Sequence, residues 1–255
     1  MAGIYGMAII TLLASAGLWG GLMYVMSGRN RRYLWLLLPG LPLSALVNVW
    51  IKRPLLVGVG QAAGIPPNVG LQTPLWFILF AFTLAPVFEE AIKVLPLLLP
   101  WVRRLLSGPA TALWVGMGLG LSFGLGEAAF LAYGVAQQPE YARLPWYVFT
   151  GYFSERLLVC FIHGVMTAVL VTGLQRGAGK GMIGYLAAMG LHALLNSGVL
   201  FFQLGLISSW AAQLMLLVPL ILVAAIFERL RRNAVRQAEA THPSEEEVVY
   251  FRRES

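Results

Sequence analysis

The sequence predicts an all-α fold, a polytopic membrane bundle of about seven transmembrane helices. Of its 255 residues, 58% are hydrophobic and only 11% are charged, whereas soluble domains average about 25% charged residues. The acidic residues are all glutamate, and the formal net charge is +7. This composition excludes a soluble enzyme, a disordered chain and a nucleic-acid-binding protein. The one cysteine, Cys160, excludes an internal disulfide and a cysteine-based metal cluster.

Apolar stretches long enough to cross a bilayer recur along the chain, since about 20 helical residues span a hydrocarbon core of roughly 30 Å. The predicted spans are 4–26, 33–51, 75–99, 110–135, 147–172, 181–204 and 207–227. The first lacks the basic start and the cleavage site of a signal peptide, so we expect it to be retained. We expect residues 1–228 to form the membrane domain, with the motifs in 86–200. Residues 229–255 then form a cytoplasmic tail, basic and then acidic, that is partly disordered.

The basic residues predict an orientation. Thirteen of the 18 lysines and arginines follow the first, third, fifth and seventh spans, and the opposite side has only Lys52, Arg53 and Arg143. By the positive-inside rule, the N-terminus lies outside and the C-terminus is cytoplasmic. We therefore expect a multi-pass integral protein, located in the plasma membrane of a prokaryote.

Residues 54–74, after the second predicted span, are apolar but interrupted by glycine and proline. We expect an interfacial or re-entrant stretch at the outer leaflet. A lid or a substrate entrance is the alternative.

Six ionisable residues lie within predicted spans, where each costs roughly 2.5–3.5 kcal/mol to insert. They are Glu89, Glu90, Lys93, Glu127, Glu155 and Arg156. Together they would cost on the order of 15–20 kcal/mol unless they pair or face a wet cavity. We therefore expect them to converge inside the bundle.

The third span carries two adjacent glutamates, Glu89 and Glu90, shortly after a helix-kinking proline, Pro86. Lys93 is close enough along the helix to pair with either glutamate. A structural ion pair would account for one glutamate, but not for two that point about 100° apart. The pair therefore indicates a functional role.

The fourth span carries Glu127 after a ladder of glycines. The ladder consists of Gly116, Gly118, Gly120, Gly124 and Gly126. Small residues let helices approach closely, so we expect Glu127 to lie against the third or fifth span. It is either a site residue or the partner of a buried cation.

The fifth and sixth spans supply two histidines. Arg156 and His163 share one helical face, and we expect Arg156 to neutralise a glutamate. His192 and Asn196 are four residues apart on one face of the sixth span. Polar residues at matching depths of four consecutive spans predict one buried cluster.

Such a cluster is suited to hydrolysis. A glutamate in an apolar pocket is a good general base for water near neutral pH, and histidine can orient the water or protonate the leaving amine. Asn196 can donate to an oxyanion. Alternatively, His163, His192 and Glu127 bind zinc and another glutamate acts as the base. Because there is no HExxH motif, we favour a glutamic-type peptidase that needs no cofactor over a metallopeptidase.

Four motifs resemble those of an intramembrane protease superfamily, which contains the CAAX prenyl endopeptidases, the PrsW-type site-1 proteases and the YhfC-like peptidases. The motifs are FEEAIK (88–93), FGLGE (123–127), Glu155-Arg156 with His163, and HALLN (192–196). The EExxK form and Phe123 are most similar to PrsW, whereas the Glu155-Arg156 pair is more similar to YhfC. Two positions depart from the patterns. CAAX endopeptidases have histidine at Glu127, and PrsW proteins usually have asparagine at Ala128.

The resemblance implies an intramembrane endopeptidase acting on membrane proteins or peptides in the bilayer, alone or in a membrane-protein complex. The implied catalytic residues are Glu89, Glu90, Glu127, His163, His192 and Asn196, supported by Lys93, Glu155 and Arg156. Two alternatives stay open. One is a non-catalytic scaffold of the gamma-secretase Aph type, which is similar around GLSFG (120–124) but lacks the paired glutamates. The other is a proton-coupled transporter.

Overall fold

A computed structural model describes residues 3–66 and 73–241 of the chain. These residues contain helices and no strands, and seven helical segments are long and apolar enough to cross a membrane. The spans are Gly3–Met26, Leu43–Ala62, Leu75–Leu98, Ala110–Ala136, Trp146–Gln175, Ala178–Gln203 and Ser209–Gln237. The predicted fold class is confirmed.

Several spans are built from more than one helical element. The first contains α1 (Gly3–Ser15), the π-helical turn η1 (Ala16–Gly20) and α2 (Gly21–Met26). The 3-10 helix η2 (Arg31–Leu37) precedes the second, which contains α3 (Leu43–Val47), the π-helical turn η3 (Asn48–Lys52) and α4 (Arg53–Ala62). The third contains α5 (Leu75–Ile92) and η4 (Leu95–Leu98), and the short α6 (Pro100–Arg103) follows. The others are α7 (Pro109–Ala136), η5 (Trp146–Phe149) with α8 (Thr150–Gln175), α9 (Ala178–Gln203), and α10 (Ser209–Met215) with α11 (Leu217–Thr241).

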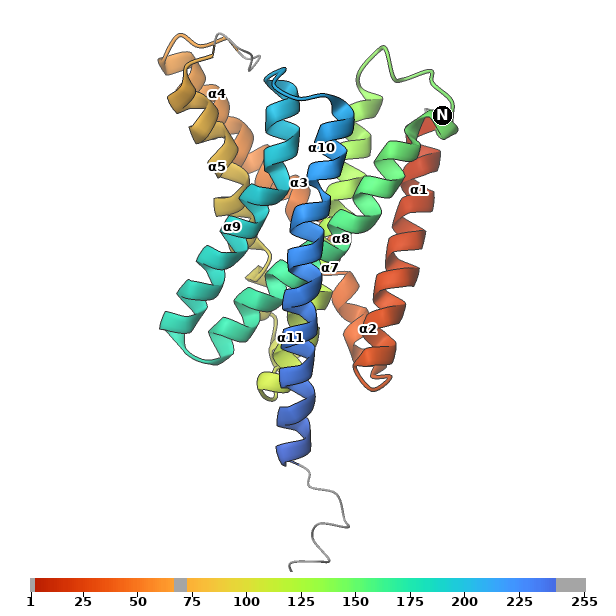
Figure 1. The fold of residues 1–255 in the computed structure, drawn as a ribbon, viewed down its shortest axis with the longest axis vertical. Coiled ribbons are helices and arrows are strands. Elements are labelled where there is room, and N and C mark those ends of the chain that lie inside the picture. The colour runs from red at the N-terminus through yellow and green to blue at the C-terminus, as the bar shows by residue number, and fades with distance from the viewer. Residues whose placement is uncertain (1–2, 67–72, 242–255) are drawn as a thin grey trace, which may run out of the picture.

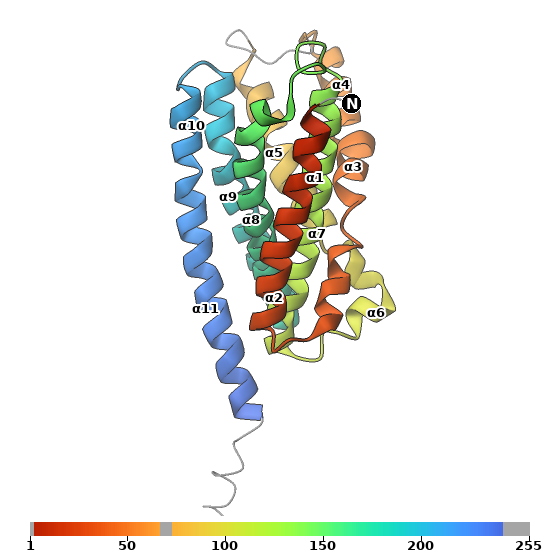
Figure 2. The ribbon, with the colours of Figure 1, turned by 90° about the vertical axis from the view of Figure 1, so that its right-hand side faces the viewer.

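The helices α7 and α8 form the centre of the bundle (Figures 1 and 2). Helix α1 packs along both of them, α9 packs on the other side of α8, and α5 packs on α9. Helix α11 runs along the outside, against α7 and α8 (Figure 2). The two central helices therefore carry the most deeply buried positions, and α5 and α9 bring their polar residues towards them.

Glycines set how closely α7 approaches its neighbours. A Cβ atom added to Gly116, Gly120 or Gly124 would collide with the backbone of α8. At Gly118 and Gly126 it would collide with Leu36 and Leu41 on the other side. The close packing predicted from the glycine ladder is confirmed, and it places Glu127 against α8.

The second span differs from the predicted range of 33–51. It begins only at Leu43 and continues through Pro54 to Ala62. Proline lacks a backbone donor, but it stands in the first turn of α4, directly after the π-helical turn η3, where the hydrogen-bond pattern is already interrupted. The interfacial stretch predicted from residue 54 onwards is therefore wrong for 54–62. Residues 67–72 of that stretch lie outside the described residues.

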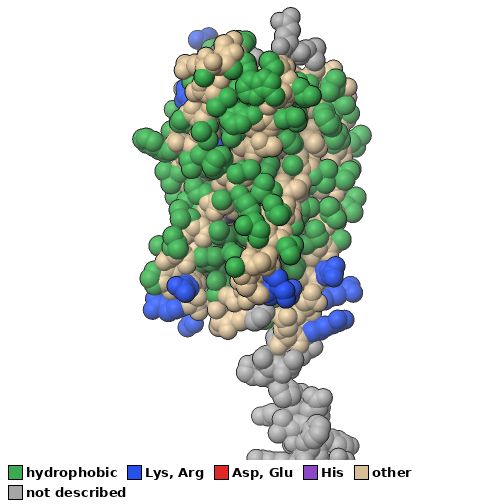
Figure 3. Space-filling model, turned by 90° about the vertical axis from the view of Figure 1, so that its left-hand side faces the viewer, with side chains coloured by type: hydrophobic (Ala, Val, Ile, Leu, Met, Phe, Trp, Pro, Cys, Tyr) green, Lys and Arg blue, Asp and Glu red, His purple; other side chains and the backbone are tan. Residues whose placement is uncertain are grey.

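The same extension moves two basic residues. Lys52 and Arg53 were expected in a loop outside the membrane, and the structure places both within the second span. Apolar side chains cover the middle of the molecule, and lysine and arginine gather at the lower end in Figure 3. Helix α11 continues through the basic part of the predicted tail to Thr241, and residues 242–255 lie outside the described residues.

Candidate active site

The paired glutamates lie at the end of α5, in the interior of the bundle. Glu89 and Glu90 are 1% and 0% exposed, and Lys93, which caps the helix, is 0% exposed. Burial of a charged group is tolerated when it is paired and hydrogen-bonded. Each of these three side chains has an ionic partner.

Glu89 is paired with a lysine from another span. Its Oε1 accepts a hydrogen bond from Lys52 Nζ at 2.5 Å. Its Oε2 has no hydrogen-bond partner in the described part of the chain and lies 3.8 Å from His192 Nε2. One oxygen of this carboxylate is therefore held, and the other faces a histidine without a bond to it.

Lys52 was not predicted as a site residue. The residues that follow Arg53 are apolar or neutral, which was a signal that the helix could extend past it, but Pro54 was read as a helix break. The π-helical turn η3 ends at Lys52 and presents its side chain to α5.

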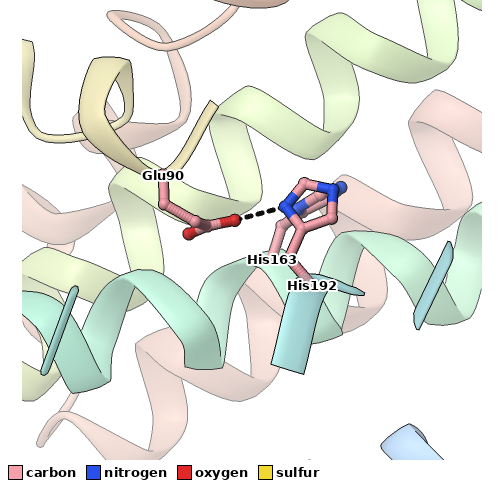
Figure 4. A group of neighbouring side chains, drawn as sticks. All are labelled: Glu90, His163 and His192. Atoms are coloured by element: carbon pink, nitrogen blue, oxygen red, sulfur yellow. Dashed lines mark hydrogen bonds and ion pairs between the residues drawn. The ribbon is translucent and has the colours of Figure 1, made fainter. Parts of the chain in front are cut away.

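Glu90 binds two groups through one oxygen. Its Oε1 accepts from Lys93 Nζ at 2.5 Å. The same oxygen accepts from His192 Nδ1 at 2.5 Å (Figure 4). Its Oε2 is buried and has no hydrogen-bond partner among the residues described. Since a carboxylate oxygen accepts, Nδ1 of His192 carries a proton.

His163 stands between a cation and an anion. Its Nδ1 lies 2.7 Å from Lys93 Nζ, and its Nε2 lies 2.9 Å from Glu127 Oε2. An ammonium group only donates, so the network assigns the proton of His163 to Nε2, which donates to Glu127. The Phe123 ring packs edge-on against His163, with centroids 5.5 Å apart, and lies 4.8 Å from Lys93 Nζ.

Arg156 closes the network on the α8 side. Its guanidinium donates to Glu127 Oε2 at 3.0 Å and to Glu155 Oε1 at 2.6 Å. The prediction that Arg156 neutralises a glutamate is confirmed. Contacts thus run without a break from Lys52 to Glu155, and we call this set the glutamate–histidine cluster. Its members are Lys52, Glu89, Glu90, Lys93, Glu127, Glu155, Arg156, His163 and His192.

The cluster contains three side chains arranged to hold a metal ion. Donor atoms of Glu90, His163 and His192 all lie within 4.8 Å of one another, and one carboxylate with two imidazoles is a common zinc donor set. The unpartnered Oε2 of Glu90 is a further donor. Glu127 was expected in this set, but it binds the other nitrogen of His163, which is the usual place of a carboxylate that orients a metal ligand.

Lys93 competes for the same donors. Its ammonium contacts both Glu90 Oε1 and His163 Nδ1, and these two atoms belong to the side chains of the candidate metal site. The residues therefore fit a zinc-type ion if the Lys93 ammonium moves aside. The cluster holds four glutamates and three cationic side chains, so with neutral histidines it has one negative charge in excess.

Asn196 does not join the cluster. It lines a neighbouring cavity of about 490 Å³ between α8, α9, α10 and the start of α11. Glu155 and Arg156 line the same cavity. The structure thus brings together eight of the nine predicted site residues, adds Lys52, and places Asn196 beside them.

A family model described as PrsW family intramembrane metalloprotease matches residues 10–226. No curated protein and no solved structure matches the chain. The similarities to the CAAX endopeptidases and to the YhfC branch stay predictions, because the matching model is that of the PrsW family. The match covers well over half of the chain and contains the whole glutamate–histidine cluster. The chain belongs to the PrsW family of intramembrane metalloproteases.

Proposed function

We propose that the glutamate–histidine cluster hydrolyses peptide bonds of membrane proteins within the bilayer. The observation that carries the proposal is the state of the paired glutamates. Both are fully buried, and each has one oxygen held by a lysine and one oxygen without a hydrogen-bond partner among the described residues. Two pre-aligned carboxylates beside a histidine are what proton transfer to and from a reacting water requires.

Glu89 is the proposed general base. Its unpartnered Oε2 faces His192 Nε2, and it takes the proton of the attacking water as the new C–O bond forms. That proton then passes to the amine nitrogen as the C–N bond breaks, so no other reactant is needed. Glu90 holds His192 in one tautomer and orientation through its bond to Nδ1.

A bound metal is compatible with these roles. Held by Glu90, His163 and His192, a zinc-type ion would polarise the carbonyl of the cleaved bond. Glu89, which is not one of these three side chains, would still serve as the base. The glutamic and metal-assisted mechanisms therefore share Glu89 and differ in what Glu90 and the histidines do.

The scaffold and transporter alternatives have no support from the family match. A scaffold of the Aph type lacks the paired glutamates that this chain keeps. We also propose the orientation that the basic residues favour, with the N-terminus outside and the C-terminus in the cytoplasm of a prokaryotic cell. Assembly into a larger membrane complex is a further proposal that the sequence left open.

The test is proteolysis in liposomes. The purified protein is reconstituted with a panel of single-span membrane proteins, tagged at both ends, and cleavage is followed by gel. We expect Glu89→Gln, Glu90→Gln and His192→Ala to lower cleavage by about 100-fold or more. Glu140→Gln, at an exposed loop position, is the matched control and should cleave normally. Unchanged cleavage by all three site variants would refute the proposal, and a stable membrane partner without any cleavage would favour the scaffold.

A further inference from the structure

The cavity beside Asn196 has the size and position of a binding site. Its volume of about 490 Å³ lies within the range of about 300–1,000 Å³ typical of ligand pockets. It is bounded by the first half of α8, the second half of α9, and α10 with the start of α11. Most of the wall is apolar, as at Leu158, Val199 and Leu217.

Two amide side chains interrupt this apolar lining, in addition to Glu155, Arg156 and two serines. Asn196 reaches the cavity from α9 and Gln213 from α10, and neither has a side-chain partner in the part of the chain that the structure describes. An amide carries both donors and acceptors, and a polar group without a partner is costly at membrane depth. The two amides therefore favour an occupant that offers hydrogen bonds of both kinds.

The cavity is connected to the glutamate–histidine cluster at two points. Asn196 follows His192 by one helical turn on the same face of α9. Arg156 lines the cavity and also binds Glu127, which binds His163. A chain lying in the cavity is thus next to the residues proposed to cleave it.

We infer that this cavity is a substrate subsite that holds an unwound stretch of membrane polypeptide beside the cleaved bond. The inference rests on the proposed peptidase function. A lipid acyl chain offers no hydrogen bonds, whereas each unwound residue of a polypeptide exposes an N–H and a C=O that the bilayer leaves unsatisfied. Asn196 and Gln213 satisfy such main-chain groups, and the apolar wall receives side chains. The sequence predicted that Asn196 donates a hydrogen bond to an oxyanion. Its place in the cavity wall indicates instead that it binds the main chain of the substrate.

Kinetics of cleavage provide the first test. Asn196→Leu and Gln213→Leu keep similar side-chain size and remove the hydrogen bonds, and each should raise KM about 3- to 10-fold with kcat nearly unchanged. Gln203→Leu, at an exposed position on α9 that does not line the cavity, should have no effect. Ala212→Trp, which fills the cavity from α10, should raise KM further. Wild-type KM in the two leucine variants, or a loss of kcat alone in Asn196→Leu, would overturn the subsite.

Cross-linking tests the cavity independently of activity. In the inactive Glu89→Gln protein, a photoreactive maleimide is attached to Val199→Cys, which lines the cavity, or to Leu186→Cys, an exposed position elsewhere on α9. The native Cys160 is buried and should stay unlabelled. A single-span protein that the active enzyme cleaves should cross-link from Val199→Cys and not from Leu186→Cys. Equal cross-linking, or cross-linking to lipid alone, would refute the subsite, whereas no cleavage of any protein by the unmutated enzyme would refute the peptidase instead.

Discussion

At the scale of single residues, the two catalytic candidates have different surroundings. Glu90 is locked, since Lys93 and His192 share its Oε1 and none of the side chain is exposed. Glu89 is held by Lys52, whose side chain is 20% exposed, and it makes no hydrogen bond to His192. The more loosely held carboxylate is the better candidate for a group that must exchange protons with water.

Lys52 should be required to keep Glu89 in place. Lys52→Met leaves the buried carboxylate without a counter-ion, and we expect it to destabilise the protein by about 2–4 kcal/mol, somewhat less than for a fully buried pair. Cleavage should fall at least 10-fold, and Lys52→Arg should recover most of it. Arg53→Gln, next in sequence and exposed, is the control. Thermal unfolding in detergent and liposome cleavage measure the two effects, and normal behaviour of Lys52→Met would contradict the role.

Lys93 should limit metal binding. Its ammonium contacts Glu90 Oε1 and His163 Nδ1, so Lys93→Met frees two of the three donor side chains. We expect this variant to hold more zinc per chain than the unmutated protein, measured by elemental analysis after dialysis, and His192→Ala introduced alongside should abolish the gain. Lys180→Met, exposed at the start of α9, is the control. Equal zinc content in all four proteins would show that the three side chains do not form a metal site.

At the scale of helices, the position of the histidine depends on contact between α7 and α8. The backbone of α8 at His163 lies directly against Gly120 of α7, and the side chain of His163 then meets Glu127, two turns further along α7. Two helix backbones can touch only where the side chains between them are small. The glycine ladder thus determines the geometry of the site, although none of its members carries a reactive group.

A single methyl group should disturb this contact. Gly120→Ala drives a Cβ atom into the carbonyl of His163, which cannot move without moving α8. We expect a loss of about 1–3 kcal/mol or more in stability, together with a loss of cleavage. Gly134→Ala meets nothing within 4 Å in the same helix and should be neutral or slightly stabilising. Similar unfolding temperatures for the two alanine variants would show that the helices can separate without penalty.

At the scale of the whole molecule, the two ends differ in charge. The loops between α2 and η2, α6 and α7, and α8 and α9 are at the same end as the basic part of α11, and the loop after α7 is at the other (Figure 1). Lys52 and Arg53 lie within the second span and not in a loop at the opposite end. The end with the basic part of α11 therefore still carries more lysine and arginine than the other end. The proposed orientation therefore does not depend on the range predicted for that span.

Accessibility of engineered cysteines tests the orientation. Ser107→Cys, before α7, and Gln138→Cys, after α7, are exposed at opposite ends. In intact cells a membrane-impermeant maleimide should label Gln138→Cys at once and Ser107→Cys only after permeabilisation. Because Cys160 is buried, a protein without either substitution serves as the unlabelled control. The reverse pattern would mean that the N-terminus is cytoplasmic.

Hydropathy, together with the depth of polar residues within the predicted spans, was enough to predict most of the fold and part of the candidate site. Six spans agree with the predicted ranges to within a few residues, apart from the longer end of the seventh. Glu89, Glu90, His163 and His192 were predicted to lie in one buried cluster because charged and polar residues at membrane depth need partners. The second span was misplaced because a proline was taken as a break, although a preceding π-helical turn accommodates it.

The pairing of the partners could not be predicted, because a sequence gives the depth of a residue but not the rotation of its helix. Glu127 and Glu90 are both glutamates within predicted spans, and only the packing of α7 on α8 directs Glu127 to Arg156 and to Nε2 of His163. Glu90 therefore joins the two histidines instead. For the same reason Asn196, although on the face of His192, reaches a cavity and not the cluster.

On the proposed mechanism, and with neutral histidines, the excess of one carboxylate over the cations acts on the reaction path. A peptide bond is neutral, so a substrate that enters displaces water without cancelling this charge, and the electric field in the site becomes less screened. Water that stays beside Glu89 is then polarised towards the carboxylate, and the amide nitrogen that takes up the proton as the C–N bond breaks is attracted to the same place. The binding of an uncharged chain is therefore enough to strengthen the force that separates the proton from the water.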